Sequence, residues 1–195
     1  MKSEFIELPI LAQRALGAFT QISLRWPKTH PAPLPGELLR LHDGSLLYPM
    51  LHTHSGQLEA LSSCVQAESS LKLAGSTGER INLVPSQPAL ILADGIALAT
   101  LIHLCSTRRQ TPASTLALYQ LTEPLPFRPQ PSRFLLDGMP DGVIAAIPLL
   151  EDWGIPSRLC HSQDQAGCFE GSLDELVSLL PHPPECQIIC LTNGQ

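Results

Sequence analysis

The chain has 195 residues, of which 44% are hydrophobic and 15% are charged, a balance typical of a globular protein. Its net charge of −6 and the lack of any Lys/Arg cluster argue against nucleic acid and acidic membranes as partners. Glu4 and Glu7 interrupt the short apolar N-terminal stretch, and no apolar run approaches the roughly 20 residues of a membrane span. We therefore expect a cytoplasmic protein with neither a secretory signal nor a membrane helix.

The N-terminal part predicts short strands joined by tight turns. Apolar and polar residues alternate between Ala18 and Trp26, and Asp43-Gly44 is a strong hairpin signal. Gly75–Gly78 predicts a further turn. This pattern favours a small antiparallel β-barrel or sandwich, a first domain over residues 1–84. The expected strands are Ala18–Trp26, Glu37–Leu41, Ser45–Leu51, Gly56–Ser62 and Ser70–Ala74.

From residue 85 onward strands alternate with helices, which predicts an α/β domain with a parallel sheet over residues 85–195. Ser172 followed by Glu175 three residues later has the capping-box pattern of a helix start. The expected elements are strand Ala89–Ala93, helix Ile96–Arg108, strand Thr115–Gln120, a short edge piece Phe134–Leu136, helix Asp141–Trp153, strand Ser157–His161, helix Ser172–Leu180 and strand Gln187–Leu191.

The segment from Pro88 to Leu104 is the most informative stretch of the chain. An apolar strand, a tight turn and a small-residue helix follow one another, as in a dinucleotide-binding unit whose helix N-terminus faces a pyrophosphate. Asp94 stands in the turn where such units usually have glycine. We expect its carboxylate to cap the helix by accepting bonds from the amide of Ala97 or its neighbours, in the space that a phosphate would need. The alternative is a relaxed loop that admits a neutral or cationic ligand.

Several local patterns resemble the ferredoxin–NADP reductase-like superfamily when taken in chain order over about residues 15–195. Leu34–Leu39 is similar to the start of a barrel strand in that family, and Gly75–Gly78 to the turn before its second domain. Ala93–Leu101 is similar to its nucleotide loop. Gly167–Leu176 resembles the segment that opens its penultimate helix, and Ile189–Thr192 its last strand.

The resemblance implies a flavin-binding-like barrel followed by an NAD(P)-binding-like domain. It implies FAD or FMN and NAD(P) as cofactors, and electron transfer between a nicotinamide nucleotide and a flavin. A redox protein partner or a homo-oligomer is compatible with that role. The opposing hypothesis is a non-catalytic relative that keeps the fold and acts as a protein-interaction or small-ligand-binding module.

This sequence departs most from the family at the flavin-binding motif. Its Arg-Pro-Tyr-Ser run aligns with Tyr48, Pro49, Met50 and Leu51, so only the proline is kept. Tyr48 could stack on a ring and Met50 could pack against it; the alternative is that both are ordinary barrel residues. Arg40 and Arg80 are the candidates for the missing positive charge.

The sequence also departs from the family at the nicotinamide-binding loop. Asp94 and Ala97 replace two glycines of the aligned loop and Thr100 its proline, while Gly95 is kept and Ile96 lies between Gly95 and Ala97. Cys190 aligns with the family cysteine near the nicotinamide. We take these five positions and Cys190 as cofactor-binding candidates, and we assign no catalytic residue.

Metal chemistry has little support in the sequence. The six cysteines form no Cys-x-x-Cys pair, so we expect reduced, mostly buried thiols and no iron–sulfur cluster. His52 and His54 lie two apart on an expected strand, but no third ligand is near them in sequence. Four acids are expected on the surface or at helix ends rather than as a catalytic pair: Asp137, Asp141, Glu151 and Asp152.

Overall fold

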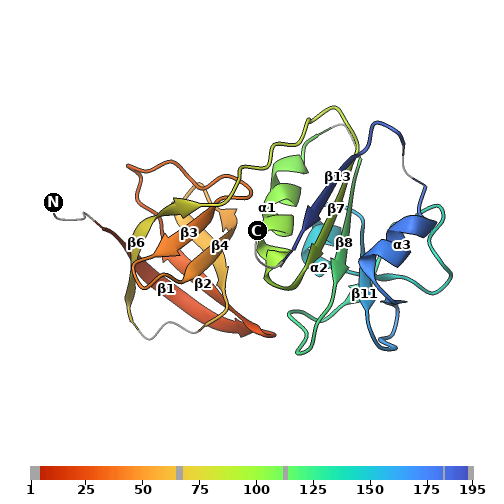
Figure 1. Cartoon of the computed structure of the whole chain (residues 1–195), viewed down its shortest axis with the longest axis horizontal. Coiled ribbons are helices and arrows are strands. Elements are labelled where there is room, and N and C mark those ends of the chain that lie inside the picture. The colour runs from red at the N-terminus through yellow and green to blue at the C-terminus, as the bar shows by residue number, and fades with distance from the viewer. Residues whose placement is uncertain (1–4, 65–67, 112–113, 182, 193–195) are drawn as a thin grey trace.

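The computed structural model describes residues 5–64, 68–111, 114–181 and 183–192. Its first part is a closed antiparallel barrel in the strand order β1-β2-β5-β4-β3-β6, at the left of Figure 1. The expected barrel is thus confirmed. Its strands are β1 (Ile6–Leu16), β2 (Phe19–Arg25), β3 (Leu38–Leu41), β4 (Leu46–His52), β5 (Gln57–Ser62) and β6 (Ser70–Thr77).

Alternating burial along the strands fills the barrel with aliphatic side chains. Ile22 and Leu24 on β2 are buried, while Gln21 and Ser23 between them are partly exposed. The β3–β4 turn has the predicted form, because the Asp43 carboxylate accepts hydrogen bonds from the amide and hydroxyl of Ser45, at 2.9 and 2.6 Å.

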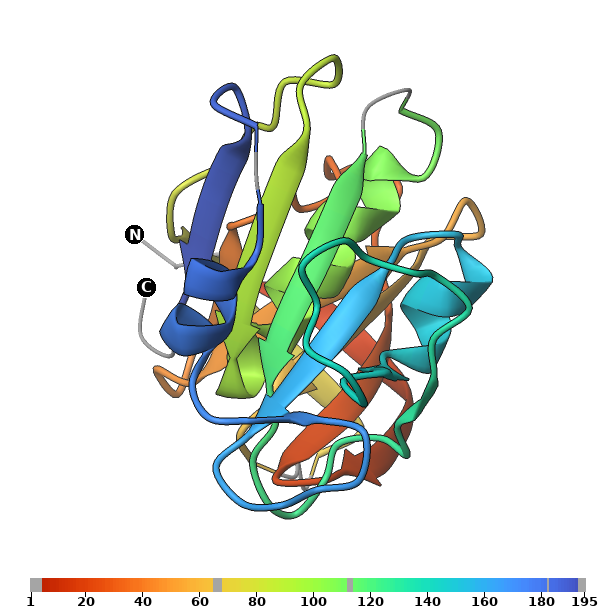
Figure 2. The ribbon, with the colours of Figure 1, turned by 90° about the vertical axis from the view of Figure 1, so that its right-hand side faces the viewer.

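The second part is an α/β unit with a five-stranded parallel sheet in the order β12-β11-β8-β7-β13, which Figure 2 shows face on. This confirms the predicted α/β class. A separate two-stranded pair, β9 with β10, lies beside it. The elements are β7 (Ala89–Asp94), 3-10 helix η1 (Gly95–Ala97), α1 (Leu98–Arg108), β8 (Thr115–Gln120), β9 (Gln130–Pro131), β10 (Ala145–Ala146), α2 (Pro148–Asp152), β11 (Ser157–His161), β12 (Phe169–Glu170), α3 (Leu173–Leu179) and β13 (Gln187–Leu191).

Helix α1 lies between the barrel and the sheet and joins their cores (Figure 1). Met50 of β4 and Leu61 of β5 belong to the same buried cluster as Leu98 and Leu101 of α1. The helix is buried on nearly all sides, because it packs against β4 of the barrel as well as β7 and β8. Barrel and sheet therefore share one apolar contact region. No helix among the described residues is long and apolar enough to cross a membrane.

Four sequence predictions of elements were wrong. The first strand, β1, was missed, because most of its side chains are exposed or half-buried and give no clear apolar stripe. The Gly75–Gly78 turn was placed too early, since β6 continues to Thr77. Helix Asp141–Trp153 is only α2, which begins at Pro148, and the residues before it include β10. The expected edge piece at Phe134–Leu136 is not a strand; β9 forms at Gln130–Pro131 instead.

The capping box of α3 is confirmed. The Ser172 hydroxyl accepts from the Glu175 amide, and the Glu175 carboxylate accepts from the Ser172 amide at 2.7 Å. This bond from the Ser172 amide, with a second from the Ser172 hydroxyl at 3.0 Å, lowers the pKa of Glu175.

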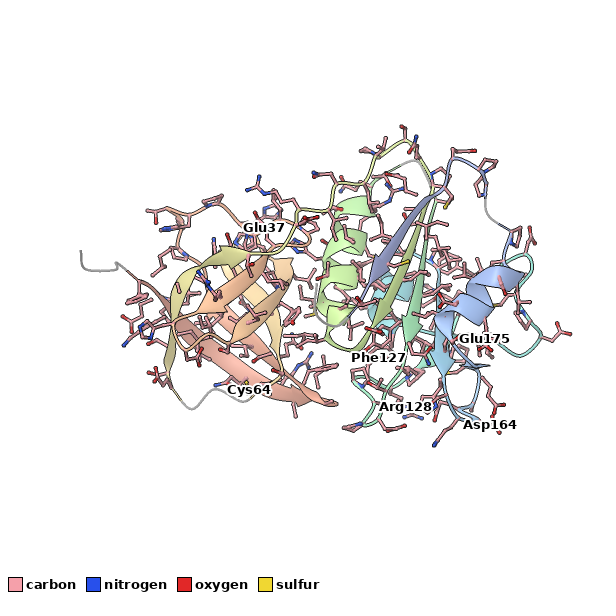
Figure 3. All side chains as sticks on the ribbon, in the orientation of Figure 1. Glu37, Cys64, Phe127, Arg128, Asp164 and Glu175 are labelled. Carbon is pink, nitrogen blue, oxygen red and sulfur yellow. The ribbon has the colours of Figure 1, made fainter. Side chains whose placement is uncertain are left out.

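His103 of α1 is buried where the helix meets the barrel, and this burial lowers the pKa of its imidazole to about 4. Glu37, near the start of β3 (Figure 3), opposes the shift, and His52 adds to it. In the unfolded chain the His103 imidazole has its ordinary pKa of 6.5. At pH values between about 4 and 6.5 the unfolded chain therefore binds a proton at His103 that the folded protein does not bind.

We therefore expect folding stability to be highest above about pH 6.5 and to fall as the pH drops toward 4, by on the order of 3 kcal/mol. Urea midpoints across this range would measure the loss. The His103→Leu variant should flatten the slope, whereas His54→Leu, at an exposed position, should not. Equal slopes for wild-type protein and His103→Leu would contradict this assignment.

Candidate functional site

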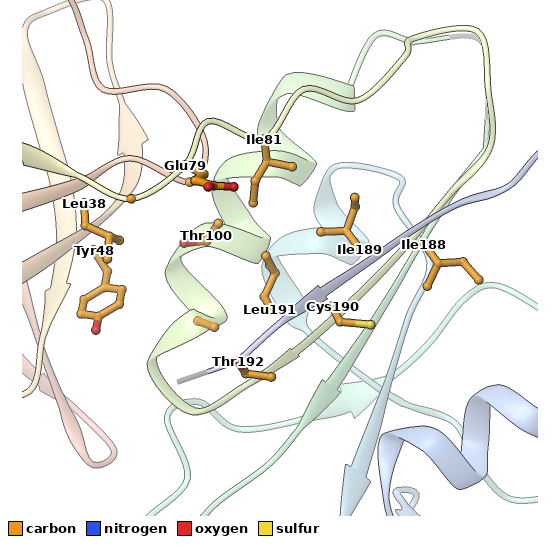
Figure 4. A pocket seen from close by; sticks show the side chains of 13 residues that line it. Leu38, Tyr48, Glu79, Ile81, Thr100, Ile188, Ile189, Cys190, Leu191 and Thr192 are labelled. Carbon is orange, nitrogen blue, oxygen red and sulfur yellow. The ribbon is translucent and has the colours of Figure 1, made fainter. Parts of the chain in front are cut away.

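A cavity between the barrel and the sheet has a volume of about 530 Å³, which is within the range of small-molecule sites. We call it the barrel–sheet cavity. The barrel contributes Tyr48, the linker Ile81, helix α1 Thr100, and strand β13 the run from Ile188 to Leu191 (Figure 4). Its lining residues are Gly36, Leu38, Tyr48, Gly78, Glu79, Ile81, Ala97, Thr100, Ile188, Ile189, Cys190, Leu191 and Thr192.

The lining of this cavity is mostly aliphatic and carries little charge. Glu79 is its one charged side chain, and no lysine or arginine lines it among the described residues. Polar side chains come from Tyr48, Thr100 and Thr192, while Cys190 lines the cavity from β13 with its side chain directed away from α1 (Figure 4). Such a lining suits a ring-bearing apolar ligand that makes a few directed polar contacts.

The four residues aligned with the flavin motif are not all at this cavity. Tyr48 lines it, whereas Pro49 and Met50 are buried and Leu51 is half-buried. Tyr48, Met50 and Leu51 pack with the cluster that contains α1. The β4 surface that the sequence assigned to a flavin is thus largely covered by a helix of the same chain, and only its Tyr48 end opens to the cavity.

The two arginines that the sequence offers as phosphate partners, Arg40 and Arg80, do not line the cavity. Arg80 forms an ion pair with Glu37 at 2.7 Å, between Nε and Oε1. Arg40 is an exposed residue of β3. Because a flavin phosphate is usually neutralised by such a group, the residues present do not fit a phosphate here.

The turn after β7 is built differently from the sequence prediction. Asp94 takes the N-cap position with extended backbone angles, but its side chain makes no capping hydrogen bond, so the predicted cap is wrong. The helix starts with the tight turn of η1, entered through Gly95 at φ 47°, and this geometry differs from the α-helical N-terminus on which capping depends.

A buried tyrosine fixes this turn. The Tyr119 hydroxyl of β8 donates to the Gly95 carbonyl at 2.9 Å, and Tyr119 is fully buried. Burial, with the nearby Asp94 charge, raises the pKa of Tyr119. Gly95, Ile96 and Ala97 are themselves buried. The loop predicted to cradle a pyrophosphate is therefore packed into the core.

A smaller cavity of about 240 Å³ lies at the carboxyl ends of the parallel strands, where open α/β sheets bind ligands. We call it the strand-end cavity. Asp94 after β7 and Asp174 in the first turn of α3 both line it, beside Gln120 and Ser172. Cys190 lines this cavity as well as the barrel–sheet cavity.

Asp174 was not singled out from the sequence. The available signal was an acid in the first turn of the helix that the Gly167–Leu176 segment opens. No lysine or arginine lines the strand-end cavity among the described residues, so two carboxylates define its charge. A diphosphate, which carries negative charge, does not fit this donor set.

Other candidates from the sequence lie elsewhere. His52 ends β4 and His54 lies in the following turn, and no group of three potential metal ligands occurs among the described residues. The prediction of a surface role is wrong for Glu151, which is buried and accepts bonds from the Ser132 hydroxyl and the Arg133 amide. All six cysteines, which lie in the described ranges, are free thiols, and two of them are fully buried.

Comparison with known proteins identifies the fold. No family model and no curated protein sequence matches the chain. A ferredoxin reductase in carbazole 1,9a-dioxygenase matches with a TM-score of 0.65 and 17% identity over 96% of this chain. A flavohemoglobin from Malassezia yamatoensis with bound FAD and heme matches at 0.62 and 12% over 97%. An NADH-dependent reduced ferredoxin–NADP oxidoreductase also matches at 0.62 and 12% over 97%.

The chain therefore has the ferredoxin–NADP reductase-like fold, a barrel followed by a nucleotide-binding-like α/β unit. It spans 60%, 53% and 69% of the lengths of these three proteins, respectively. At 12–17% identity the likeness concerns the fold.

Proposed function

We propose that this chain is a ferredoxin reductase-like module whose barrel–sheet cavity binds a flat, largely apolar ligand that is uncharged or cationic. One observation carries the proposal. The charged side chains that line the two cavities are three carboxylates, Glu79, Asp94 and Asp174, and no lysine or arginine lines either cavity among the described residues. A cavity of ligand size lies between the barrel and the sheet, while the charge of its lining is opposite to that which a dinucleotide needs.

The lining explains which ligand chemistry is favoured. Leu38, Ile81 and Leu191 offer aliphatic surface to the faces of a ring, and the phenol of Tyr48 offers an aromatic contact. The hydroxyl groups of Thr100 and Thr192 can hydrogen-bond ring substituents at the edges. A ligand of this kind contacts the cavity without placing an anion near the carboxylates.

A second candidate function is flavin-linked electron transfer. The fold favours it, because the matched flavohemoglobin structure contains FAD. An isoalloxazine ring without phosphate has the flat, apolar form that the barrel–sheet cavity suits, and a bound flavin would supply the electron-accepting group. Tyr48 would then contact the ring, and the β13 segment from Ile188 to Leu191 would form the opposite wall.

Riboflavin, an uncharged carrier of this ring, is a suitable probe of the cavity. We expect it to raise the melting temperature of the purified protein, because a ligand of the native state stabilises it. The Ile81→Trp variant, which fills the cavity from the linker, should abolish that shift. Ile144→Trp, at an exposed position outside the cavity, is the matched control and should keep it.

The same preparation tests the second candidate. A protein purified with a yellow flavin chromophore, and whose FAD is reduced by NADPH, would favour the electron-transfer function over the binding module. A colourless protein whose melting temperature does not respond to riboflavin, or responds equally in the Ile81→Trp variant, would contradict ligand binding in the barrel–sheet cavity.

A further inference from the structure

Strand β13 is the long open edge of the parallel sheet. The other edge, β12, has only two residues, whereas β13 pairs with β7 along all five of its residues without a register shift. Its sequence, Gln-Ile-Ile-Cys-Leu, contains no charge, proline or bulge. Proteins usually protect sheet edges with one of these devices, so β13 is an unprotected edge.

The outward backbone groups of β13 can be assigned from its pairing. The Gln187 amide donates to the Pro88 carbonyl, so Gln187, Ile189 and Leu191 direct their backbone groups toward β7. By alternation, Ile188 and Cys190 direct theirs away from the sheet. Within the described part of the chain, the backbones of Ile188 and Cys190 form no hydrogen bond with residues outside the sheet.

The side chains at this edge are apolar and partly exposed. Ile188 is 43% exposed and Cys190 is exposed, both on the face away from α1, while Ile189 and Leu191 point toward α1 (Figure 4). Val84 extends the patch, because it is 46% exposed and is joined to the Gln187 side chain by hydrogen bonds of 2.8 and 3.1 Å.

We propose that β13 pairs antiparallel with β13 of a second copy of this chain. A two-fold axis at Ile189 places Ile188 opposite the partner's Cys190, and both residues direct their backbone groups into the interface. They therefore form a hydrogen-bonded pair, and the two Ile189 residues form a non-hydrogen-bonded pair at the axis. The strand is compatible with itself, because no like charges meet in this register.

The pairing goes beyond the proposed function and also bears on it. The barrel–sheet cavity is lined on one side by residues 188–192, so the β13 strand of the second copy would lie along the rim of this cavity. The pairing does not require a ligand, and it can be tested on the protein alone. The short strand gives a small interface, for which we expect dissociation in the micromolar range.

Sedimentation equilibrium across the micromolar range tests the association. We expect the mass to rise from the 21.1 kDa of one chain toward twice that value. Ile188→Lys should raise the dimer dissociation constant at least about tenfold, because it places two lysines at the paired edge. The position is exposed, so the melting temperature should stay near that of the wild-type protein.

A cysteine at the axis tests the register. In a Cys64→Ser, Cys190→Ser background, which removes the two exposed thiols, Ile189→Cys should oxidise rapidly to a disulfide-linked dimer. The reason is that a non-hydrogen-bonded antiparallel pair has Cα atoms within disulfide range. Leu135→Cys in the same background is the control, since Leu135 is fully exposed and outside the edge.

Three results would overturn the proposal. The first is a protein that stays monomeric at all concentrations, whether or not it binds an extended peptide at β13. The second is a dimer that Ile188→Lys leaves unchanged. The third is Ile189→Cys that cross-links no faster than Leu135→Cys. Riboflavin binding by a protein that stays monomeric would overturn the pairing alone and leave the proposed function standing.

Discussion

The Arg108→Met variant is expected to lose about 3 kcal/mol of unfolding free energy, because it removes a buried charged donor that satisfies one buried and two partly buried acceptors. Arg108 ends α1 and is only 4% exposed. Its guanidinium donates to the Thr115 hydroxyl at 2.7 Å, to the Val84 carbonyl at 3.1 Å and to the Gln87 carbonyl at 2.7 Å. These bonds fix the linker from the barrel onto the sheet.

The neighbouring arginine is a matched control. Arg109 is exposed, and its guanidinium lies 4.9 Å from the ring centroid of Trp153. Arg109→Met removes this cation–π contact and should cost only about 0.5–1 kcal/mol. Urea denaturation of the two variants gives the comparison. Equal losses would show that the buried hydrogen bonds of Arg108 do not hold the linker.

The second large effect is expected on anion binding. Replacing both carboxylates of the strand-end cavity, as Asp94→Asn with Asp174→Asn, should tighten NADPH binding about 100-fold, roughly tenfold for each charge removed. Asparagine keeps the shape of each side chain, so the charge is the main change. Equilibrium titration of NADPH onto wild-type and double-variant protein would measure the ratio of dissociation constants.

The exposed acid Asp152, outside both cavities, provides the control for net charge. Asp152→Asn combined with Asp141→Asn removes the same total charge far from the strand ends and should change NADPH binding by less than about threefold. If the double variant of Asp94 and Asp174 binds NADPH no better than this control, the two carboxylates are not what weakens anion binding at the strand-end cavity.

Much of the fold could be predicted from the sequence where local chemistry decides the structure. Strands β8, β11 and β13 have the predicted bounds, and β8 and β13 are short, mostly apolar runs. The start of α3 was fixed by the Ser172–Glu175 capping box. In these cases neighbouring residues alone specify the backbone.

Tertiary context decided the rest. The apolar residues before Pro148 fit a helix by composition, but they are buried beside β11, where Ala145 and Ala146 pair with β9 instead. Met50 was a plausible ring contact in the sequence, yet α1 covers it. Asp174 could not be placed near Asp94, because the two are 80 residues apart and only the parallel sheet brings them to one edge.

Calorimetric titration of riboflavin and of FAD onto the wild-type protein tests most directly whether the carboxylates of the two cavities disfavour anionic ligands. The two ligands share the same ring, and FAD adds a diphosphate and an adenosine. We expect riboflavin to bind at least about tenfold more tightly than FAD, since the carboxylates disfavour the added negative charge. FAD that binds as tightly as riboflavin, or more tightly, would contradict the account and support a flavin-dependent reductase.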